Sequence, residues 1–368
     1  MGLGGAEPQV SPQLASGWPQ GRSDLRMEPA TGLAALTPAT REALTTAVHA
    51  GGHRARHSRL ACAALCACMT LACSNVAAPG PESPAIPAEP RQGQLTGLLD
   101  DLGRIVGRET VDRGAELLRM FRERGLEPLE QEFPATATEW QPRETGKNLI
   151  ATVGDGPRDI VVGAHYDVVR LQDGTVVGGA VDNGAASVVL TRVAETLSRH
   201  ELGHRIRVVL FDLEEAGLLG SQAYVQAEGA TRVAAMVNVD VVVGEGTLMY
   251  GPTSHEGNDT VYRSLRVACA ASEITCMGFP RYPPSDDRPF QAAGIPNVSL
   301  AMNGTAEAHQ MWLVLNAGPE SGLREGFMPE VFRIIHSSRD TIEHVSEAAM
   351  NHLHDLVVAL VLELDRTF

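Results

Sequence analysis

Carboxylate and imidazole side chains stand at the ends of three apolar segments of the chain. The segment DIVVGA is followed by His165 and Asp167, RIRVVLF by the stretch DLEEAGLLGS, and MVNV by Asp240. A glycine-rich stretch, GGAVDNGAAS, adds Asp182 just before a run with helical periodicity. Carboxylates gathered in one place repel each other unless a positive charge lies among them, and the neighbouring sequence offers no cluster of Lys or Arg. Imidazole with carboxylate suits zinc, with cobalt or manganese as alternatives, so the pattern predicts a metal centre.

The elements that must position these side chains are apolar strands that alternate with amphipathic helices. Strands are expected at 148–153, 159–164, 205–213, 234–243 and 296–302, and helices at 95–106, 111–124, 184–198, 218–226, 260–271 and 346–364. This alternation predicts an α/β fold of three layers, α/β/α, in which helices cover both faces of a twisted, mostly parallel mixed sheet. Ligands bind such sheets at the carboxyl ends of the strands, where the polar residues stand.

Six stretches occur in the order and approximate spacing of the clan MH zinc aminopeptidases: HYD, GAVDNGAAS, FDLEEAGLLGS, NVD, SDDRPFQAAGIP and HSSRDT. Over about residues 94–360 the chain resembles this family, which includes bacterial leucyl aminopeptidase-like enzymes and relatives of glutamate carboxypeptidase and glutaminyl cyclase. The resemblance implies two zinc ions per chain. One is bound by His165 and Asp240 and the other by Glu215 and His336, while Asp182 bridges the two.

The resemblance also implies roles for three further residues. Glu214 corresponds to the general base that acts on a water activated by the two zinc ions. Asp167 would orient the imidazole of His165, and Tyr282 would help to bind the oxyanion. The implied reaction removes the N-terminal residue of a peptide whose free amino terminus is positively charged.

Several residues leave alternatives open. His309 and His344 could replace His336, but only His336 begins an H-x-x-x-D-T segment after an apolar run that is expected to be a strand. Asp212, which precedes the glutamate pair, is interpreted as a packing residue at a strand end. The resemblance further implies a cis peptide bond between Asp182 and Asn183.

The chain departs from the family at positions that shape the substrate pocket. Asp287 stands where a histidine is usual, VVV follows NVD, and the segment 301–333 fits the family pattern poorly. Two rival functions therefore remain: a glutaminyl-peptide cyclotransferase with one zinc, and a noncatalytic binding domain of the same fold. The complete set of ligands and base favours the peptidase.

The N-terminal part of the chain has the plan of an export signal. The basic stretch HRARHSR precedes the apolar LACAALCACMTLAC, and residues 48–73 resemble a bacterial lipoprotein signal with Cys73 as the lipidated residue and Cys68 as second choice. A plain secretory signal or a cysteine metal cluster is the alternative. Residues 1–47 are expected to be a non-native extension, with translation starting near Val48. Residues 74–93 form a Pro/Ala-rich tether to a catalytic domain at 94–368.

The net charge and the cysteines indicate which partners and which cellular location to expect. The formal net charge of −15 opposes nucleic-acid binding, so the only expected membrane contact is the lipid anchor. An exported protein follows, either a cell-envelope lipoprotein (periplasmic or on the cell surface) or a fully secreted one. Cys269 and Cys276 could pair there or remain two free thiols. Nothing in the sequence specifies an oligomeric state.

Overall fold

The computed structural model describes residues 95–138, 141–324 and 326–368 of the 368-residue chain. The expected extension 1–47, the signal 48–73 with Cys73, and the tether 74–93 lie outside the described residues. All described residues belong to one compact unit. Within them, no helix combines the length and the apolar character needed to cross a membrane.

Eight strands of the described chain form one mixed sheet in the order β1-β2-β4-β3-β5-β8-β6-β7. Neighbours β4, β3, β5 and β8 are parallel, whereas β1 with β2, β2 with β4, and β6 with β8 are antiparallel. The short β7 pairs with β6 in parallel. The strands are β1 (Leu129–Pro134), β2 (Thr145–Val153), β3 (Asp159–His165), β4 (Arg205–Phe211), β5 (Val233–Val242), β6 (Gly246–Gly251), β7 (Thr275–Gly278) and β8 (Asn297–Gly304).

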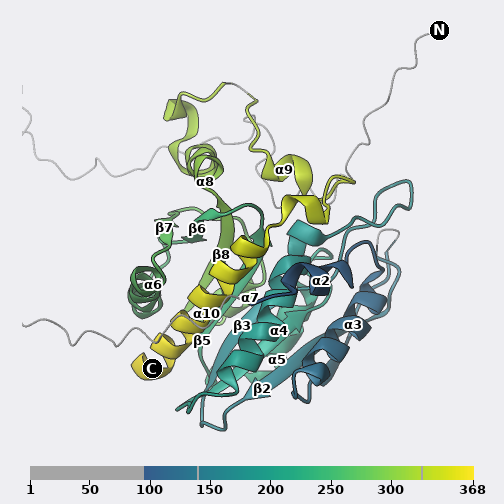
Figure 1. Cartoon of the computed structure of the whole chain (residues 1–368), viewed down its shortest axis with the longest axis vertical. Coiled ribbons are helices and arrows are strands. Elements are labelled where there is room, and N and C mark those ends of the chain that lie inside the picture. Colours follow the sequence, from purple (N-terminus) through teal and green to yellow (C-terminus); the bar gives the residue numbers. More distant parts are fainter. Residues whose placement is uncertain (1–94, 139–140, 325) are drawn as a thin grey trace, which may run out of the picture. The chain divides into compact units, whose positions relative to one another are not determined.

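Helices cover both faces of this sheet, as the sequence predicted. They are α2 (Leu98–Gly103), α3 (Thr110–Glu123), α4 (Ala185–Leu197), α5 (Leu219–Glu228), α6 (Asp259–Ser272), α7 (Asp287–Ala292), α8 (Thr305–Trp312), α9 (Val331–Ile334) and α10 (Glu347–Thr367). Figure 1 shows α4 and α10 side by side across one face. Because successive strand side chains point to opposite faces, Val162 of β3 packs in the core under these helices, while its neighbour Val161 packs with Tyr224 of α5 and Phe290 of α7.

The predicted strands all occur within a few residues of their expected bounds, and the α/β/α fold is confirmed. The sequence did not predict β1, β6 and β7, which lie at or beside the two edges of the sheet. One prediction was wrong: the apolar run before His336, which was expected to be a strand, is the short helix α9. Val331 and Ile334 of that helix are buried, so the run is apolar because it packs as a helical turn.

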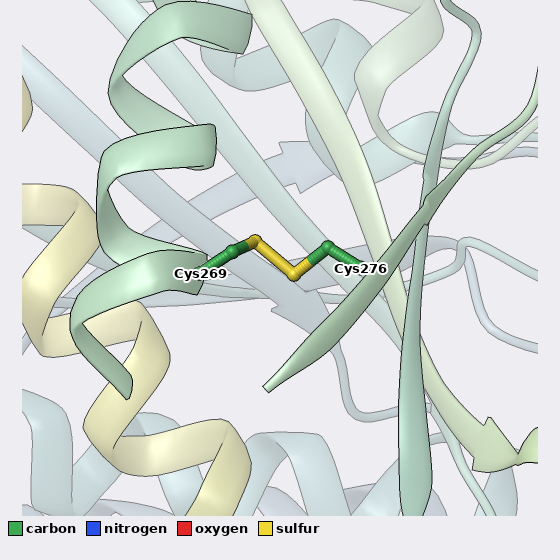
Figure 2. The surroundings of a disulfide bond; sticks show 2 residues. All are labelled: Cys269 and Cys276. Atoms are coloured by element: carbon green, nitrogen blue, oxygen red, sulfur yellow. A yellow bond between two sulfur atoms is a disulfide. The ribbon is translucent and has the colours of Figure 1, made fainter. Parts of the chain in front are cut away.

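The two cysteines of the described chain are paired. Cys269 near the end of α6 forms a disulfide with Cys276 of β7, and their Cα atoms are 6.2 Å apart (Figure 2). The open question of two free thiols is thereby resolved in favour of the bond. The disulfide links α6 to a strand at the edge of the sheet.

Candidate metal centre

The residues expected to bind metal meet at the carboxyl ends of the central parallel strands. His165 is the last residue of β3, Asp240 lies near the end of β5, and Glu215 follows β4. Asp182 lies in the turn Ala180–Gly184 before α4, and His336 follows α9. All five line a single cleft of about 990 Å³.

Asp182 lies between the two histidines and turns one oxygen toward each. Its Oδ1 is 3.0 Å from Nε2 of His165, and its Oδ2 is 3.1 Å from Nε2 of His336. Asp240 Oδ1 is 3.4 Å from Nε2 of His165, and Glu215 Oε2 is 3.1 Å from Nε2 of His336. Two groups of three donors result, one with His165 and Asp240, the other with Glu215 and His336, and Asp182 belongs to both.

The electrostatics of this cluster suit bound metal cations. Burial alone would lower the pKa of His165, but the nearby carboxylates of Asp167, Asp182 and Asp240 outweigh burial and raise that pKa well above its ordinary value. Burial raises the pKa of Glu215. The buried Oδ1 of Asp240 accepts no hydrogen bond among the described residues. Protons held in this way by imidazole and carboxylate are those that a bound metal displaces, so the residues present fit a metal centre.

Asp167 contacts both halves of the centre. Its Oδ1 is 3.4 Å from Nδ1 of His165, and the sequence predicted this contact between Asp167 and the imidazole. The same carboxylate accepts backbone hydrogen bonds from Glu214 (3.1 Å) and Glu215 (3.2 Å), which the sequence did not predict. With 3% of its surface exposed, Asp167 is held in place and ties the end of β3 to the turn after β4.

The turn that carries Asp182 is fixed from two sides. The carboxylate of Asp340 accepts hydrogen bonds from the backbone nitrogens of Val181 (2.7 Å) and Asp182 (3.2 Å). The predicted cis peptide bond between Asp182 and Asn183 is confirmed. The side chain of Asn183 bonds the backbone of Val239 and Val241 on both sides of Asp240, which couples this turn to the end of β5.

Unusual backbone conformations gather at the same place. Leu213, Val241 and His336 have φ of 59°, 75° and 54°, in the left-handed region that residues other than glycine rarely adopt. The first precedes the glutamate pair, the second follows Asp240, and the third is itself a candidate ligand. Strain of this kind persists where the surrounding structure holds it, and it is concentrated at functional sites.

Glu214 and Tyr282, the other residues that the sequence predicted for the site, also lie at the cleft. Glu214 lies with Glu215 and His165 in a third group of potential metal donors. Tyr282 lines the cleft, and its hydroxyl donates to the Met249 carbonyl at 3.4 Å. The groups of donors include His336 but neither His309 nor His344 of the described chain.

Asp212 has a structural role, as interpreted from the sequence. It is fully buried, and both its oxygens bond the guanidinium of Arg143 at 2.7 Å. Its Oδ2 also accepts the backbone N–H of Lys147 at 2.9 Å. This ion pair fastens the loop between β1 and β2 to the end of β4.

These features define the class of protein: an α/β/α fold with a candidate two-metal centre at the carboxyl ends of its strands. Residues 148–361 match peptidase family M28. The chain belongs to this family, and the resemblance found in the six sequence motifs is confirmed.

Similar proteins support the membership of this family. Aminopeptidase YwaD of Bacillus subtilis is 29% identical over 213 residues, which cover 56% of this chain and 41% of that protein. Leupeptin-inactivating enzyme 1 of Streptomyces exfoliatus is 30% identical over 236 residues, covering 60% of this chain and 49% of that protein. The chain thus spans less than half the length of these two relatives. The solved glutaminyl cyclase of Porphyromonas gingivalis has a TM-score of 0.54 at 19% identity, covering 73% of this chain and 96% of its own, and this likeness concerns the fold alone.

Proposed function

We propose that the chain is a zinc-dependent aminopeptidase that releases N-terminal residues from peptides. The observation that carries the proposal is the two-sided contact of Asp182, whose oxygens face His165 at 3.0 Å and His336 at 3.1 Å. A carboxylate shared by two donor groups suits a pair of metal ions. Membership of peptidase family M28 supports the same reaction class.

The proposed ligands are His165 and Asp240 for one ion, Glu215 and His336 for the other, with Asp182 shared. Bound zinc would supply Lewis acidity and a water that ionises near neutral pH. These oxygen and imidazole nitrogen donors form two groups of three, the number of protein ligands that is typical of catalytic zinc sites.

Glu214 is the proposed general base. Unlike its neighbour Glu215, it has no close contact with His336, while the backbone bond from Glu214 N to Asp167 holds its main chain beside the centre. Its carboxylate would accept the proton of the attacking water and deliver it to the leaving amine nitrogen. Tyr282, on the wall of the cleft, is the proposed donor to the developing oxyanion, for which its hydroxyl would leave the Met249 carbonyl, 3.4 Å away.

The charges of the cleft favour a substrate amino terminus over a carboxyl terminus. Among the described residues that line it, Arg143 is paired with Asp212, and Arg170 with Glu109. Neither arginine is therefore an unpaired cation for a substrate carboxylate, while the acidic centre attracts an ammonium group.

Apolar side chains supply the pocket for the first residue of the substrate. These side chains come from β6, β8, α8, the segment Leu313–Ala317 after α8, and α9 with the residue that follows it, and they are Met249, Ala301, Met311, Leu315, Val331, Phe332 and Ile335. Because burial of apolar surface drives binding in such a pocket, the proposed substrates begin with a large apolar residue.

Glutaminyl cyclisation is the second candidate, because the family that the six motifs resemble includes relatives of glutaminyl cyclase and the chain carries the Asp, Glu and His donors of a one-zinc site. Aminoacyl anilides and dipeptides are to be screened with and without a chelator, together with peptides that begin with glutamine. Release of free amino acids that stops on chelation and returns with zinc supports the proposal. Turnover that is indifferent to chelation refutes it, and loss of ammonia from N-terminal glutamine with one bound zinc replaces it with the cyclase. Zinc binding without any turnover would leave the noncatalytic alternative.

Export to the cell envelope is proposed on two grounds. Residues 48–73 have the plan of a lipoprotein signal ending at Cys73, and the Cys269–Cys276 disulfide is typical of an oxidising compartment. The proposed organisation is an extension at 1–47, the signal, a tether at 74–93 and a catalytic domain at 94–368. Mass spectrometry of the N-terminus of the native protein, after membrane fractionation, tests the start, the lipid and the location together.

A further inference from the structure

A fully buried arginine lies beneath the candidate metal centre. Arg113 of α3 has none of its surface exposed, and it is the largest of the fully buried side chains. Among the described residues it forms no direct ion pair, and its hydrogen bonds go to backbone carbonyls instead. Burial lowers its pKa to about 10, so the guanidinium stays positively charged at neutral pH.

The guanidinium connects two separate loops. Its Nε donates to the carbonyl of Tyr166 at 2.8 Å, and Tyr166 stands between His165 and Asp167. Its Nη1 donates to the carbonyls of Gly178 at 3.2 Å and Gly179 at 3.1 Å, and its Nη2 also reaches Gly179 at 3.0 Å. One planar group thus holds the loop after β3 against the loop that leads into the turn of Asp182.

Close packing accounts for the glycines of GGAVDNG, in part through Arg113. A Cβ on Gly179 would lie 2.3 Å from Cγ1 of Val168 and 2.7 Å from Nη1 of Arg113. A Cβ on Gly184 would lie 2.5 Å from the carbonyl oxygen of Gly179, and one on Gly178 would lie 2.0 Å from the carbonyl oxygen of Asp340. At Gly179 the backbone therefore approaches the guanidinium more closely than a residue with a Cβ would allow.

Nearby carboxylates that do not contact Arg113 directly stabilise its positive charge. The carboxylates that favour its charged form are Asp340, Asp167 and Asp182. A buried cation without a direct partner is costly, and here the surrounding carboxylates offset that cost. The contacts and the charge both point from α3 toward the two loops that bear the candidate ligands.

We infer that Arg113 is a positioning residue of the metal centre, which sets the distance between the loop of His165 and the turn of Asp182. The inference rests on the proposed function, and it extends the site to a residue outside the family match, which covers 148–361. Groups that orient metal ligands typically change metal affinity by about 10- to 100-fold when they are removed.

The test compares Arg113→Lys with the wild type in the full chain. Lysine retains the positive charge but lacks the planar fork that reaches three carbonyls. The zinc dissociation constant is measured by competition with a chelating dye, and peptide turnover gives kcat and KM separately. We expect zinc binding to weaken by about tenfold or more, with kcat at saturating zinc reduced more than KM is changed.

Arg124→Lys serves as the matched control. Arg124 directly follows the last residue of the same helix, its side chain is 5% exposed, and it bonds Asp101 and the Met120 carbonyl away from the centre. This control is expected to lose thermal stability while its zinc affinity and kcat stay at the wild-type values. Arg113→Gln, which keeps a donor without the charge, replaces the lysine variant if that protein does not fold.

The outcomes separate the two proposals. A wild-type protein that binds no zinc overturns the metal centre and the role of Arg113 together. A wild-type protein that binds two zinc ions, with an Arg113 variant of unchanged affinity and kcat, overturns the role of Arg113 alone. Equal losses of zinc affinity in the Arg113 and Arg124 variants would likewise reduce Arg113 to a general stabiliser of the fold and overturn the inference.

Discussion

Replacing Asp167 with asparagine should separate the stability of the fold from the affinity for metal. The carboxylate of Asp167 accepts two backbone N–H bonds, from Glu214 at 3.1 Å and Glu215 at 3.2 Å, and faces His165 at 3.4 Å. Asparagine has the same shape, but its amide nitrogen would face one of these N–H groups or the ring nitrogen. One charge-assisted hydrogen bond is therefore lost on the ligand-bearing side.

The magnitude follows from that contact. A hydrogen bond to a charged group contributes about 1.5–3 kcal/mol, and a loss of about 2 kcal/mol corresponds to about thirtyfold in a dissociation constant. The metal-free protein should lose less, because the substitution also removes one negative charge from a cluster of mutually repelling carboxylates, which offsets part of the lost hydrogen bond. We expect zinc to bind about thirtyfold more weakly, while the chelated variant unfolds close to the wild-type temperature.

Zinc competition titrations and thermal unfolding in chelator measure the two quantities. Asp173→Asn is the control. It removes an exposed carboxylate from the same loop after β3, where Asp173 accepts the backbone N–H of Thr175, and it should leave zinc affinity unchanged. Zinc affinity of Asp167→Asn within threefold of the wild type would refute the reasoning. So would a chelated variant that unfolds several degrees lower with its zinc affinity intact, since Asp167 would then only stabilise the fold.

Three other perturbations test the remaining parts of the structure. Glu214→Gln should lower kcat by about 10²–10⁴-fold, as expected for loss of a general base, yet retain bound zinc; normal turnover, measured with a peptide anilide, would exclude Glu214 as the base. Replacing Cys269 and Cys276 together by serine removes a disulfide between residues seven positions apart. This should lower the free energy of unfolding by about 2 kcal/mol and the melting temperature by about 4 °C. An unchanged melting curve would contradict this expectation. Burial raises the pKa of Asp287 to about 7, so the folded protein keeps a proton that the unfolded chain releases above about pH 4, and this stabilisation is lost as the pH rises toward 7. Asp287→Asn should therefore unfold at higher urea than the wild type at pH 8 but not at pH 4.5, and equal midpoints at both pH values would show that the carboxyl group is not buried as described.

The sequence predicted those elements whose side chains are buried on both faces. Strands β2, β3, β4, β5 and β8 are nearly continuous apolar runs, because helices cover the sheet on both sides. Strand β1, LEQEFP, lies at an edge and is mostly exposed, so it lacks such a run. Strand β7 has only four residues, none of them fully buried. Edge position and short length therefore removed the signal of β1 and β7.

The candidate ligands were predictable because each occurs within a distinctive local motif, whereas the residues that hold them were not. Arg113 reaches across 53 residues to Tyr166 and across 66 to Gly179, and nothing near it in the sequence marks it as special. Asp340 is different, since it ends the H-x-x-x-D segment that began with His336, and that spacing could have suggested its role. The second role of Asp167 depends on backbone N–H groups, which are invisible in side-chain patterns.

The positions of Arg113 and Arg143 in the sequence limit how small a working unit of this protein can be made. Arg113 lies beneath the centre and Arg143 neutralises Asp212, and both precede residue 148, where the family match begins. A gene fragment cut at that boundary would encode all five candidate ligands and Glu214, yet neither of these cations. Its interior would carry uncompensated negative charge at the end of β4 and around the turn of Asp182. Any transplanted or minimised version of the centre should therefore begin no later than α3, because α3 and the loop before β2 supply the counter-charge.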